Sequence, residues 1–105
     1  MINKEIKTIT SKFVETFNPK TIYLFGSYAR NDFNKDSDYD FYIVMPGKKK
    51  ITVSFRAKAY VCIYGINKKP VDIVMNNETV FAERIECFDS LEKTILEEGV
   101  VLYEK

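Results

Sequence analysis

Four short apolar runs, each separated from the next by a segment with helical periodicity, constrain the fold of this chain most strongly. Short runs rich in β-branched and aromatic residues predict buried strands, whereas apolar residues three and four positions apart predict helices that bury one face. The chain has 105 residues, enough for one hydrophobic core but not for two. We therefore expect a single small α/β domain over residues 1–105. Its strands are expected at 21–25, 38–45, 71–75 and 100–103, and its helices at 3–17, 28–30, 52–65 and 78–98.

Local signals mark where several of these helices begin or break. Ser27 is expected to be the N-cap of the short helix. Residues 89–92, Asp-Ser-Leu-Glu, have capping-box spacing, so the helix that spans them is expected to break and restart there. Residues 51–55 alternate like a strand, but the length and the alanines of 52–65 favour a helix. The apolar stripe of the last helical segment consists of Phe81, Ile85, Phe88, Leu91 and Ile95.

The composition is that of an ordinary globular protein without a strong overall charge. Sixteen basic and 15 acidic residues give a net charge of +1, so no global field calls for nucleic acid or an anionic membrane. Lys48-Lys49-Lys50 is the one dense basic stretch. We interpret it as a solvated loop, with contact to a phosphate or a nucleic-acid strand as the alternative. We expect no direct nucleic-acid binding.

Nothing in the sequence directs the chain to a membrane or out of the cytoplasm. No stretch approaches the roughly 20 apolar residues of a membrane span. Cys62 and Cys87 form neither a disulfide framework nor a zinc-binding pattern. We interpret both as reduced core residues of a cytoplasmic protein.

Histidine is absent from the chain, and its absence limits the chemistry. Without histidine there is no Ser-His-Asp or Cys-His nucleophile, no histidine general base and few ways to bind zinc. Catalysis must therefore use carboxylates, lysine, arginine, hydroxyls, backbone amides or a bound hard metal ion.

Gly26-Ser27 lies between a predicted strand and the predicted short helix. Glycine lets the backbone approach a ligand closely, and the amides that open a helix bind phosphate oxygens. The serine hydroxyl adds one more donor. Taken alone, a junction of this kind is more often an ordinary turn.

Three aspartates stand at or within predicted strands. Asp38 and Asp40 are two positions apart, so both carboxylates face one side of their strand while Tyr39 faces the other. Adjacent like charges are costly unless a cation or solvent compensates them, and oxygen ligands suit Mg²⁺. Asp72 lies inside an apolar strand, where burying an unpaired carboxylate is expensive. If the two strands are neighbours, the three carboxylates can bind two metal ions, the arrangement used for in-line phosphoryl or nucleotidyl transfer. The alternative is that Asp40 and Asp72 face solvent.

Together these fragments resemble the signature of the DNA polymerase-β-like nucleotidyltransferase superfamily, and more closely that of its minimal nucleotidyltransferases. The likeness runs in order over nearly the whole chain. One departure is Asn31, where the family often has glycine; asparagine tolerates positive φ, so the turn is expected to survive. The resembling segments are Gly26-Ser27-Tyr28-Ala29-Arg30, Ser37-Asp38-Tyr39-Asp40-Phe41, Val71-Asp72-Ile73-Val74 and residues 95–104.

The resemblance implies an α/β (α+β) fold, with a small mixed sheet of about four strands flanked by helices as in polymerase-β-like nucleotidyltransferases. It also implies roles for the residues. Gly26 and Ser27 would bind the β- and γ-phosphates of ATP. Asp38 and Asp40 would hold two Mg²⁺ ions that bridge the triphosphate. Asp72 would hold the second ion and assist deprotonation of an acceptor hydroxyl.

Arg30 has two interpretations. It can contact a nucleotide phosphate or steady the short helix, or it can form an ordinary ion pair with Asp32 or Asp36. We favour the ion pair.

The acceptor is expected to involve a partner. Larger relatives carry an added helical domain that grips the acceptor, and this chain has no length left for one, so a partner or a second copy in a homodimer must supply part of that site. The resemblance implies a HEPN-family ribonuclease toxin, with this protein as the antitoxin that transfers AMP to a toxin tyrosine. Two alternatives stay open: an antitoxin that neutralises its toxin by binding alone, and a nucleotidyltransferase that acts on a small molecule such as an aminoglycoside.

Overall fold

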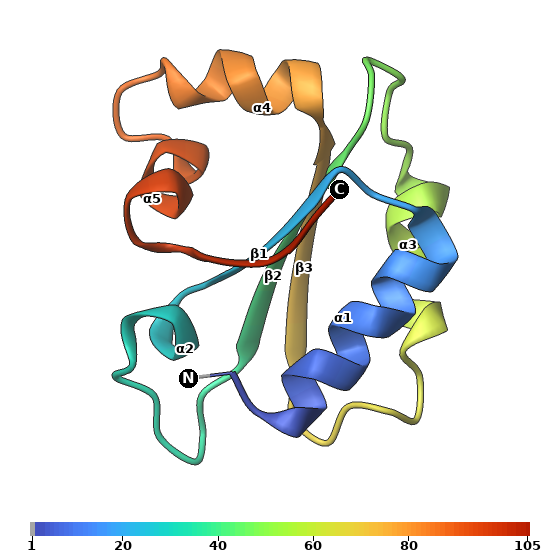
Figure 1. Ribbon diagram of the computed structural model, residues 1–105, viewed down its shortest axis with the longest axis vertical. Helices are drawn as coiled ribbons and strands as arrows, with labels where there is room; N and C mark the ends of the chain where they lie inside the picture. Colours follow the sequence, from blue (N-terminus) through green and yellow to red (C-terminus); the bar gives the residue numbers. More distant parts are fainter. Residues whose placement is uncertain (1) are drawn as a thin grey trace.

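A four-stranded sheet in the order β3-β2-β1-β4 organises the chain in a computed structural model, which describes residues 2–105 (Figure 1). β1 is antiparallel to both β2 and β4, whereas β2 and β3 run parallel. The predicted mixed sheet of about four strands is therefore confirmed. The strands are β1 (Thr21–Phe25), β2 (Tyr39–Met45), β3 (Val71–Asn77) and β4 (Val100–Glu104).

Side-chain caps mark the start of four of the helices found within residues 2–105. Each cap accepts a hydrogen bond of 2.8 to 3.1 Å from the backbone N–H three residues on. The break expected at 89–92 separates α4 from α5. No helix in this part of the chain is long and apolar enough to cross a membrane. The helices are α1 (Lys4–Phe17), α2 (Ser27–Arg30), α3 (Val53–Cys62), α4 (Glu78–Ile85) and α5 (Leu91–Glu98), and the caps are Asn3, Thr52, Asn77 and Ser90.

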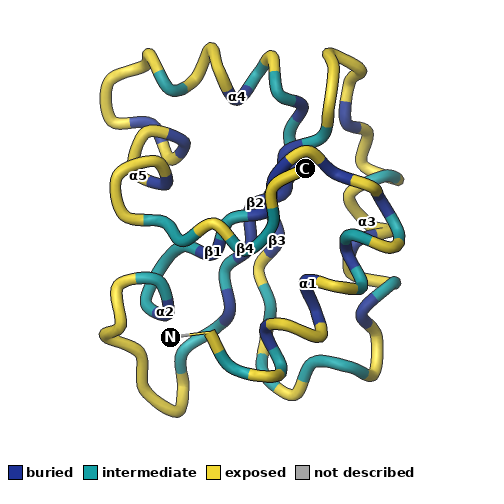
Figure 2. Tube along the Cα trace, viewed as in Figure 1, coloured by how far each residue is buried: buried dark blue, intermediate teal, exposed yellow. Residues whose placement is uncertain are grey.

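The sheet is buried on both faces. α1 and α3 cover one face, while α4 and α5 cover the other (Figure 1). The larger core lies under α1 and α3, where Phe13 meets Phe41 edge to face with the ring centroids 5.3 Å apart. The smaller core lies under α4 and α5 around Tyr42 and Phe81. Covering on both faces explains why β2 is apolar at nearly every position and dark blue along much of its trace in Figure 2.

The smaller core contains a buried carboxylate. Glu92 on α5 is 2% exposed and accepts hydrogen bonds from the Tyr42 hydroxyl at 2.6 Å and from Arg84 Nε at 2.9 Å. The Asn76 side-chain amide donates to the same Tyr42 oxygen at 3.0 Å. Burial acts to raise the pKa of Glu92, but the bonds from Tyr42 and Arg84 outweigh it and the pKa is lowered. Glu92 therefore ties α5 to both β2 and α4.

Replacing Glu92 with alanine is expected to lower the free energy of unfolding by about 3 kcal/mol. The substitution leaves a buried tyrosine hydroxyl without its acceptor and an arginine without its counter-charge. Chemical denaturation measures the loss. Glu97→Ala, at an exposed position of the same helix, is the matched control and should change stability by less than about 0.5 kcal/mol. Equal losses at the two positions would contradict a structural role for the buried carboxylate.

Three sequence predictions about local structure are wrong. Gly26, not Ser27, is the N-cap of α2, and Ser27 is the first helical residue. Phe88 is 91% exposed because α4 ends before it and it lies in the turn leading to α5. Cys87 is exposed in the same turn rather than buried. A helical stripe predicts burial only while the helix continues, and here it stops within the stripe.

Candidate active site

The register of three neighbouring strands places the candidate site. In the β1–β2 pair Phe25 lies opposite Asp40, and in the β2–β3 pair Asp40 lies opposite Asp72. Residues that are partners in register share one face of a sheet. Asp40 is therefore flanked by Asp72 on one side and, on the other, by the turn at Gly26 that follows β1.

The carboxylates lie on the face of the sheet that α4 and α5 cover. Tyr42 and Val74, two positions along from Asp40 and Asp72, belong to the smaller core. The aspartates lie beyond its margin, toward the N-terminal ends of β2 and β3. Asp40 is half-buried there and Asp72 is exposed. A solvent-borne group can thus reach Asp72, while Asp40 lies deeper.

Gly26 brings the backbone close to the Asp40 carboxylate. Its φ of 74° and ψ of −154° fall in a region that essentially only glycine occupies. A Cβ built on Gly26 would lie 2.2 Å from Oδ2 of Asp40. Both the backbone conformation and the neighbouring carboxylate therefore require glycine at this position.

α2 is a single turn that is held against the core. Asn31 ends the helix with a φ of 64°, and its N–H donates to the Ser27 carbonyl, so the turn survives without a glycine there, as expected. Tyr28 is 3% exposed and its ring centroid lies 4.7 Å from that of Tyr39. The Tyr39 hydroxyl donates to Glu5 of α1 at 2.8 Å. These contacts fix the turn and the start of β2 to one another.

Asp40 carries the most perturbed carboxylate of the site. Burial is the largest cause, and the negative charges of Asp72 and Asp38 and a side-chain contact with Asp72 add to it. Together they raise the pKa of Asp40 from 3.8 to about 6, with Arg30 opposing weakly. Closely set carboxylates without a compensating cation behave in this way. The structure thus brings Asp40 near both other aspartates predicted for the site.

The donor set fits a hard divalent cation. Mg²⁺ usually takes one or two protein carboxylates and completes its shell with water and substrate phosphates. The raised pKa of Asp40 indicates negative charge that such an ion would neutralise. Within residues 2–105, no three acidic or cysteine side chains stand close enough to hold a metal ion unaided. Substrate oxygens would have to complete the shell, and a cation shared by Asp38, Asp40 and Asp72 stays a prediction.

Asp72→Asn is expected to stabilise the metal-free protein near neutral pH. The folded-state pKa of Asp40 lies above its ordinary value, so its contribution to stability is present below about pH 3.8 and is lost as the pH rises through about 6. Asparagine at position 72 carries no charge, so it removes part of the cause that raises the pKa of Asp40 and thereby part of the stability lost at high pH. We expect Asp72→Asn to gain on the order of 1 kcal/mol over wild type above pH 7, after allowing for solvent screening, and less at pH 4. Denaturation at the two pH values measures the difference, and a gain that does not depend on pH would contradict this origin.

Arg30 forms the ion pair that the sequence analysis favoured. Its Nε lies 3.1 Å from Asp32 Oδ2, and Nη1 lies 3.7 Å from Glu98 Oε1 at the end of α5. Asp36 is not the partner in these two contacts. The Glu98 contact joins α2 to α5 and had no sequence signal, because 68 positions separate the two residues. Nucleotide contact by Arg30 stays a prediction.

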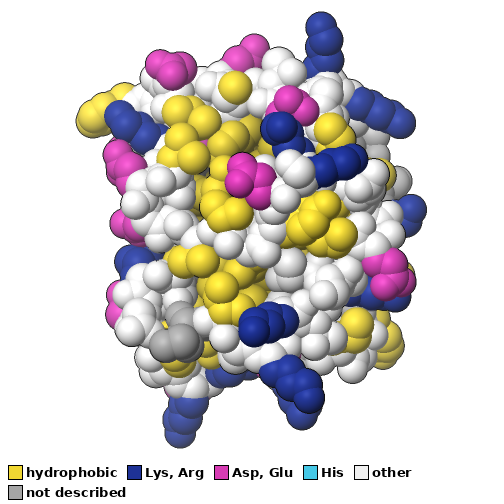
Figure 3. Space-filling view, viewed as in Figure 1, with side chains coloured by type: hydrophobic (Ala, Val, Ile, Leu, Met, Phe, Trp, Pro, Cys, Tyr) yellow, Lys and Arg dark blue, Asp and Glu magenta, His cyan; other side chains and the backbone are white. Residues whose placement is uncertain are grey.

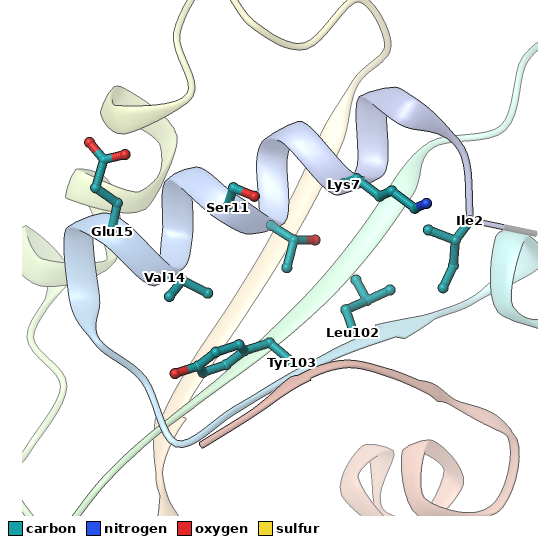
Figure 4. A pocket seen from close by; sticks show the side chains of 8 residues that line it. Ile2, Lys7, Ser11, Val14, Glu15, Leu102 and Tyr103 are labelled. Atoms are coloured by element: carbon teal, nitrogen blue, oxygen red, sulfur yellow. The ribbon is translucent and has the colours of Figure 1, made fainter.

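A groove on the surface lies away from the aspartates. It is an open groove of about 540 Å³ between α1 and the edge strand β4. Figure 4 shows Val14, Leu102 and Tyr103 along its floor, with Lys7 and Glu15 toward its two ends. None of the predicted site residues lines it, so the groove and the carboxylate site are separate features.

A mixed sheet that sets a glycine-serine turn beside aspartates of two parallel strands defines a nucleotidyltransferase. The family described as "Nucleotidyltransferase domain" matches residues 4–102. A Methanocaldococcus jannaschii protein described as a "putative protein adenylyltransferase" is 34% identical over 84 residues, which are 80% of this chain and 78% of that protein. The chain therefore belongs to the nucleotidyltransferase domain family and is an enzyme of that class.

Solved structures share the fold. A nucleotidyltransferase structure from Sulfolobus solfataricus superposes with a TM-score of 0.64 at 24% identity, covering 97% of this chain and 79% of that one. A structure titled as a toxin-antitoxin with AMP-PNP gives 0.72 at 19% identity, covering 98% and 75%. A variant of a complex named MntA-HpeT gives 0.70 at 16% identity, covering 98% and 75%. The nucleotidyltransferase family and the α/β fold with a small mixed sheet, both inferred from the sequence, are confirmed.

Proposed function

We propose that this protein transfers AMP from ATP to a hydroxyl group. The acceptor is a tyrosine of a HEPN-family ribonuclease toxin, and the protein acts in the cytoplasm as the antitoxin. The observation that carries the proposal is the position of Asp40. It is half-buried between the Gly26 turn and Asp72, with a raised pKa that a cation would reverse.

Each residue has a role in this proposal. Gly26 and Ser27 bind the β- and γ-phosphates, and the absence of a side chain at position 26 keeps the turn close to Asp40. Asp38 and Asp40 would hold two Mg²⁺ ions together with the phosphates, and Asp72 would hold the second of them. Bound Mg²⁺ would neutralise the charge that develops as pyrophosphate leaves. Arg30, already paired with Asp32 and Glu98, keeps α2 in place beside the phosphates.

The transfer balances without any further reactant. The acceptor oxygen forms a bond to the α-phosphorus of ATP, and the bond from that phosphorus to the β-phosphate oxygen breaks. Pyrophosphate leaves, and the hydroxyl proton passes to a carboxylate oxygen of Asp72. Asp72 suits this step because it is the exposed member of the three, where an acceptor can reach it.

The acceptor is inferred from relatives. One relative is described as a protein adenylyltransferase, and two of the similar structures are described as toxin-antitoxin complexes, one with an ATP analogue. These descriptions support a protein acceptor and a toxin partner for this chain.

Incubation with α-labelled ATP, Mg²⁺ and the purified toxin partner tests the proposal. We expect label on the toxin, loss of its ribonuclease activity, and no label when the acceptor tyrosine is replaced by phenylalanine. Neutralisation without label would show an antitoxin that acts by binding alone. Label on an aminoglycoside but not on the toxin would show a small-molecule enzyme. Either result would overturn the proposal.

A further inference from the structure

α3 is apolar on the side that faces solvent. Val53 is 79% exposed and Val61 is 70% exposed, with exposed Ala57 between them at four-residue spacing. Tyr64, in the turn directly after the helix, is 89% exposed and continues the line. Residues four apart lie on one face of a helix, so these side chains form one stripe. Contiguous exposed apolar surface of this kind marks an interaction site more often than scattered single residues do.

The segment that carries this stripe is strongly basic. Residues 46–70 contain seven basic residues and no acidic one, whereas the rest of the chain has the other nine basic residues and all 15 acidic ones. The net charge of +1 is therefore the sum of +7 on residues 46–70 and −6 on the rest of the chain. In Figure 3 dark blue side chains lie along the upper right margin, where Figure 1 places α3 and the loop before it, while magenta side chains gather toward α4 and α5. The basic residues are Lys48, Lys49, Lys50, Arg56, Lys58, Lys68 and Lys69.

α3 also closes the free edge of β3. The Tyr60 hydroxyl accepts from the Ile73 N–H at 3.0 Å and donates to the Ile73 carbonyl at 3.4 Å. β3 is an outer strand, and an unpaired outer strand invites another strand to pair with it. Tyr60 occupies the groups that such a strand would use at Ile73. Strand pairing at Ile73 is therefore blocked, which favours a partner that binds to the side chains of α3.

The same contact fixes α3 at the outer edge of β3. Ile73 follows Asp72, whose side chain is exposed on the opposite face of β3 from the one that α3 covers. A protein bound along α3 would therefore reach around the outer edge of β3 to present an acceptor to the carboxylate proposed to receive its proton.

We propose that α3 is the docking surface for the toxin partner. The surface consists of the apolar stripe of Val53, Ala57, Val61 and Tyr64 and of a basic border, Arg56 and Lys58, beside it. The toxin partner presents an amphipathic helix with acidic residues along its flanks. This inference rests on the proposed function. Two helices pack through stripes of three- and four-residue spacing, and the basic border selects acidic flanks. Three of the four stripe residues are aliphatic and offer neither base stacking nor base hydrogen bonding, so Tyr64 alone could stack on a base, which favours a protein over RNA.

The test compares two double variants in binding to the purified toxin partner. Val61→Glu with Tyr64→Glu places acids within the α3 stripe, and Leu96→Glu with Val101→Glu places the same acids on α5 and β4, at side chains that are each 49% exposed. We expect the α3 variant to weaken the toxin affinity by about tenfold or more and the control to change it less than about threefold. Added salt should weaken wild-type binding, and less so after Arg56→Gln with Lys58→Gln. Thermal unfolding and AMP-PNP binding should stay at wild-type values in all variants.

The outcomes separate this inference from the proposed function. If the α3 variant binds and labels the toxin as wild type does, the docking surface is wrong while the proposed function stands. If wild type neither binds nor labels the toxin, both are wrong. If wild type binds a single-stranded RNA oligonucleotide and the α3 variant does not, with toxin binding unchanged, the surface serves nucleic acid and the inference is overturned.

Discussion

Asp40→Asn is expected to lower the rate of AMP transfer by about 1,000-fold and, at the same time, to make the metal-free protein more stable at neutral pH. The loss follows from removing an anionic oxygen at the centre of the site, between the Gly26 turn and Asp72. The gain follows because asparagine has the shape of aspartate without the charge that raises the pKa of Asp40 to about 6. We expect a gain on the order of 1 kcal/mol, since the group is only partly buried.

Three measurements check this pair of effects. Label transfer gives the rate, chemical denaturation gives the free energy of unfolding, and the rise in thermal stability on adding Mg²⁺ with AMP-PNP gives ligand binding. Asp36→Asn, an identical change in the exposed loop after α2, is the matched control and should retain most of the activity. Asp40→Asn with a nearly wild-type rate, or with reduced stability, would show that Asp40 is a structural carboxylate.

The architecture was predictable because the apolar runs and helical stripes each have one dominant period. The central part of β2 is buried on both faces and reads as a continuous apolar run, and α1 has a single apolar face. Errors arose where a stripe extends past the helix that it describes. Phe88 fits the spacing of Phe81 and Ile85, but the chain turns after Ile85, so the spacing loses its meaning there.

The candidate site was predictable only in part, because strand register is a long-range property. The alternation of Asp38 and Asp40 follows from strand geometry alone. That Asp40 lies beside Asp72 depends on how the β2–α3–β3 connection sets two parallel strands, which no local pattern encodes. The same holds for the contact between Tyr42 and Glu92, which lie 50 positions apart.

The exposed stripe on α3 shows a different limit of sequence patterns. Periodicity finds apolar residues at helical spacing but does not say which face the sheet covers. Ala59 and Ile63 fit one helical face, which the structure buries, whereas Val61 belongs to a second apolar side that the structure leaves exposed. The sheet covers only one of the two apolar sides of α3. The other side stays exposed, can bind a partner, and has basic residues beside it.

Gly26→Ala is expected to cost about 3 kcal/mol of stability and to abolish transfer, since it moves Asp40. Gly47→Ala is the matched control, because Gly47 has a φ of 81° but nothing within 4 Å of a Cβ, whereas a Cβ on Gly26 would lie 2.2 Å from Asp40 Oδ2. Both changes impose backbone strain, so the control should cost about 1 kcal/mol and leave transfer intact.

Adding Asp40→Ala to each glycine variant separates strain from contact. Without the Asp40 carboxylate, Gly26→Ala should cost less than in the wild-type background and retain only its backbone strain, whereas the cost of Gly47→Ala should not change. The difference between the two cycles, measured by denaturation, is the energy with which the Gly26 turn holds Asp40 in place. Additive costs at Gly26 would mean that the turn and the carboxylate are independent, and the close backbone approach would then no longer explain why glycine stands at this position.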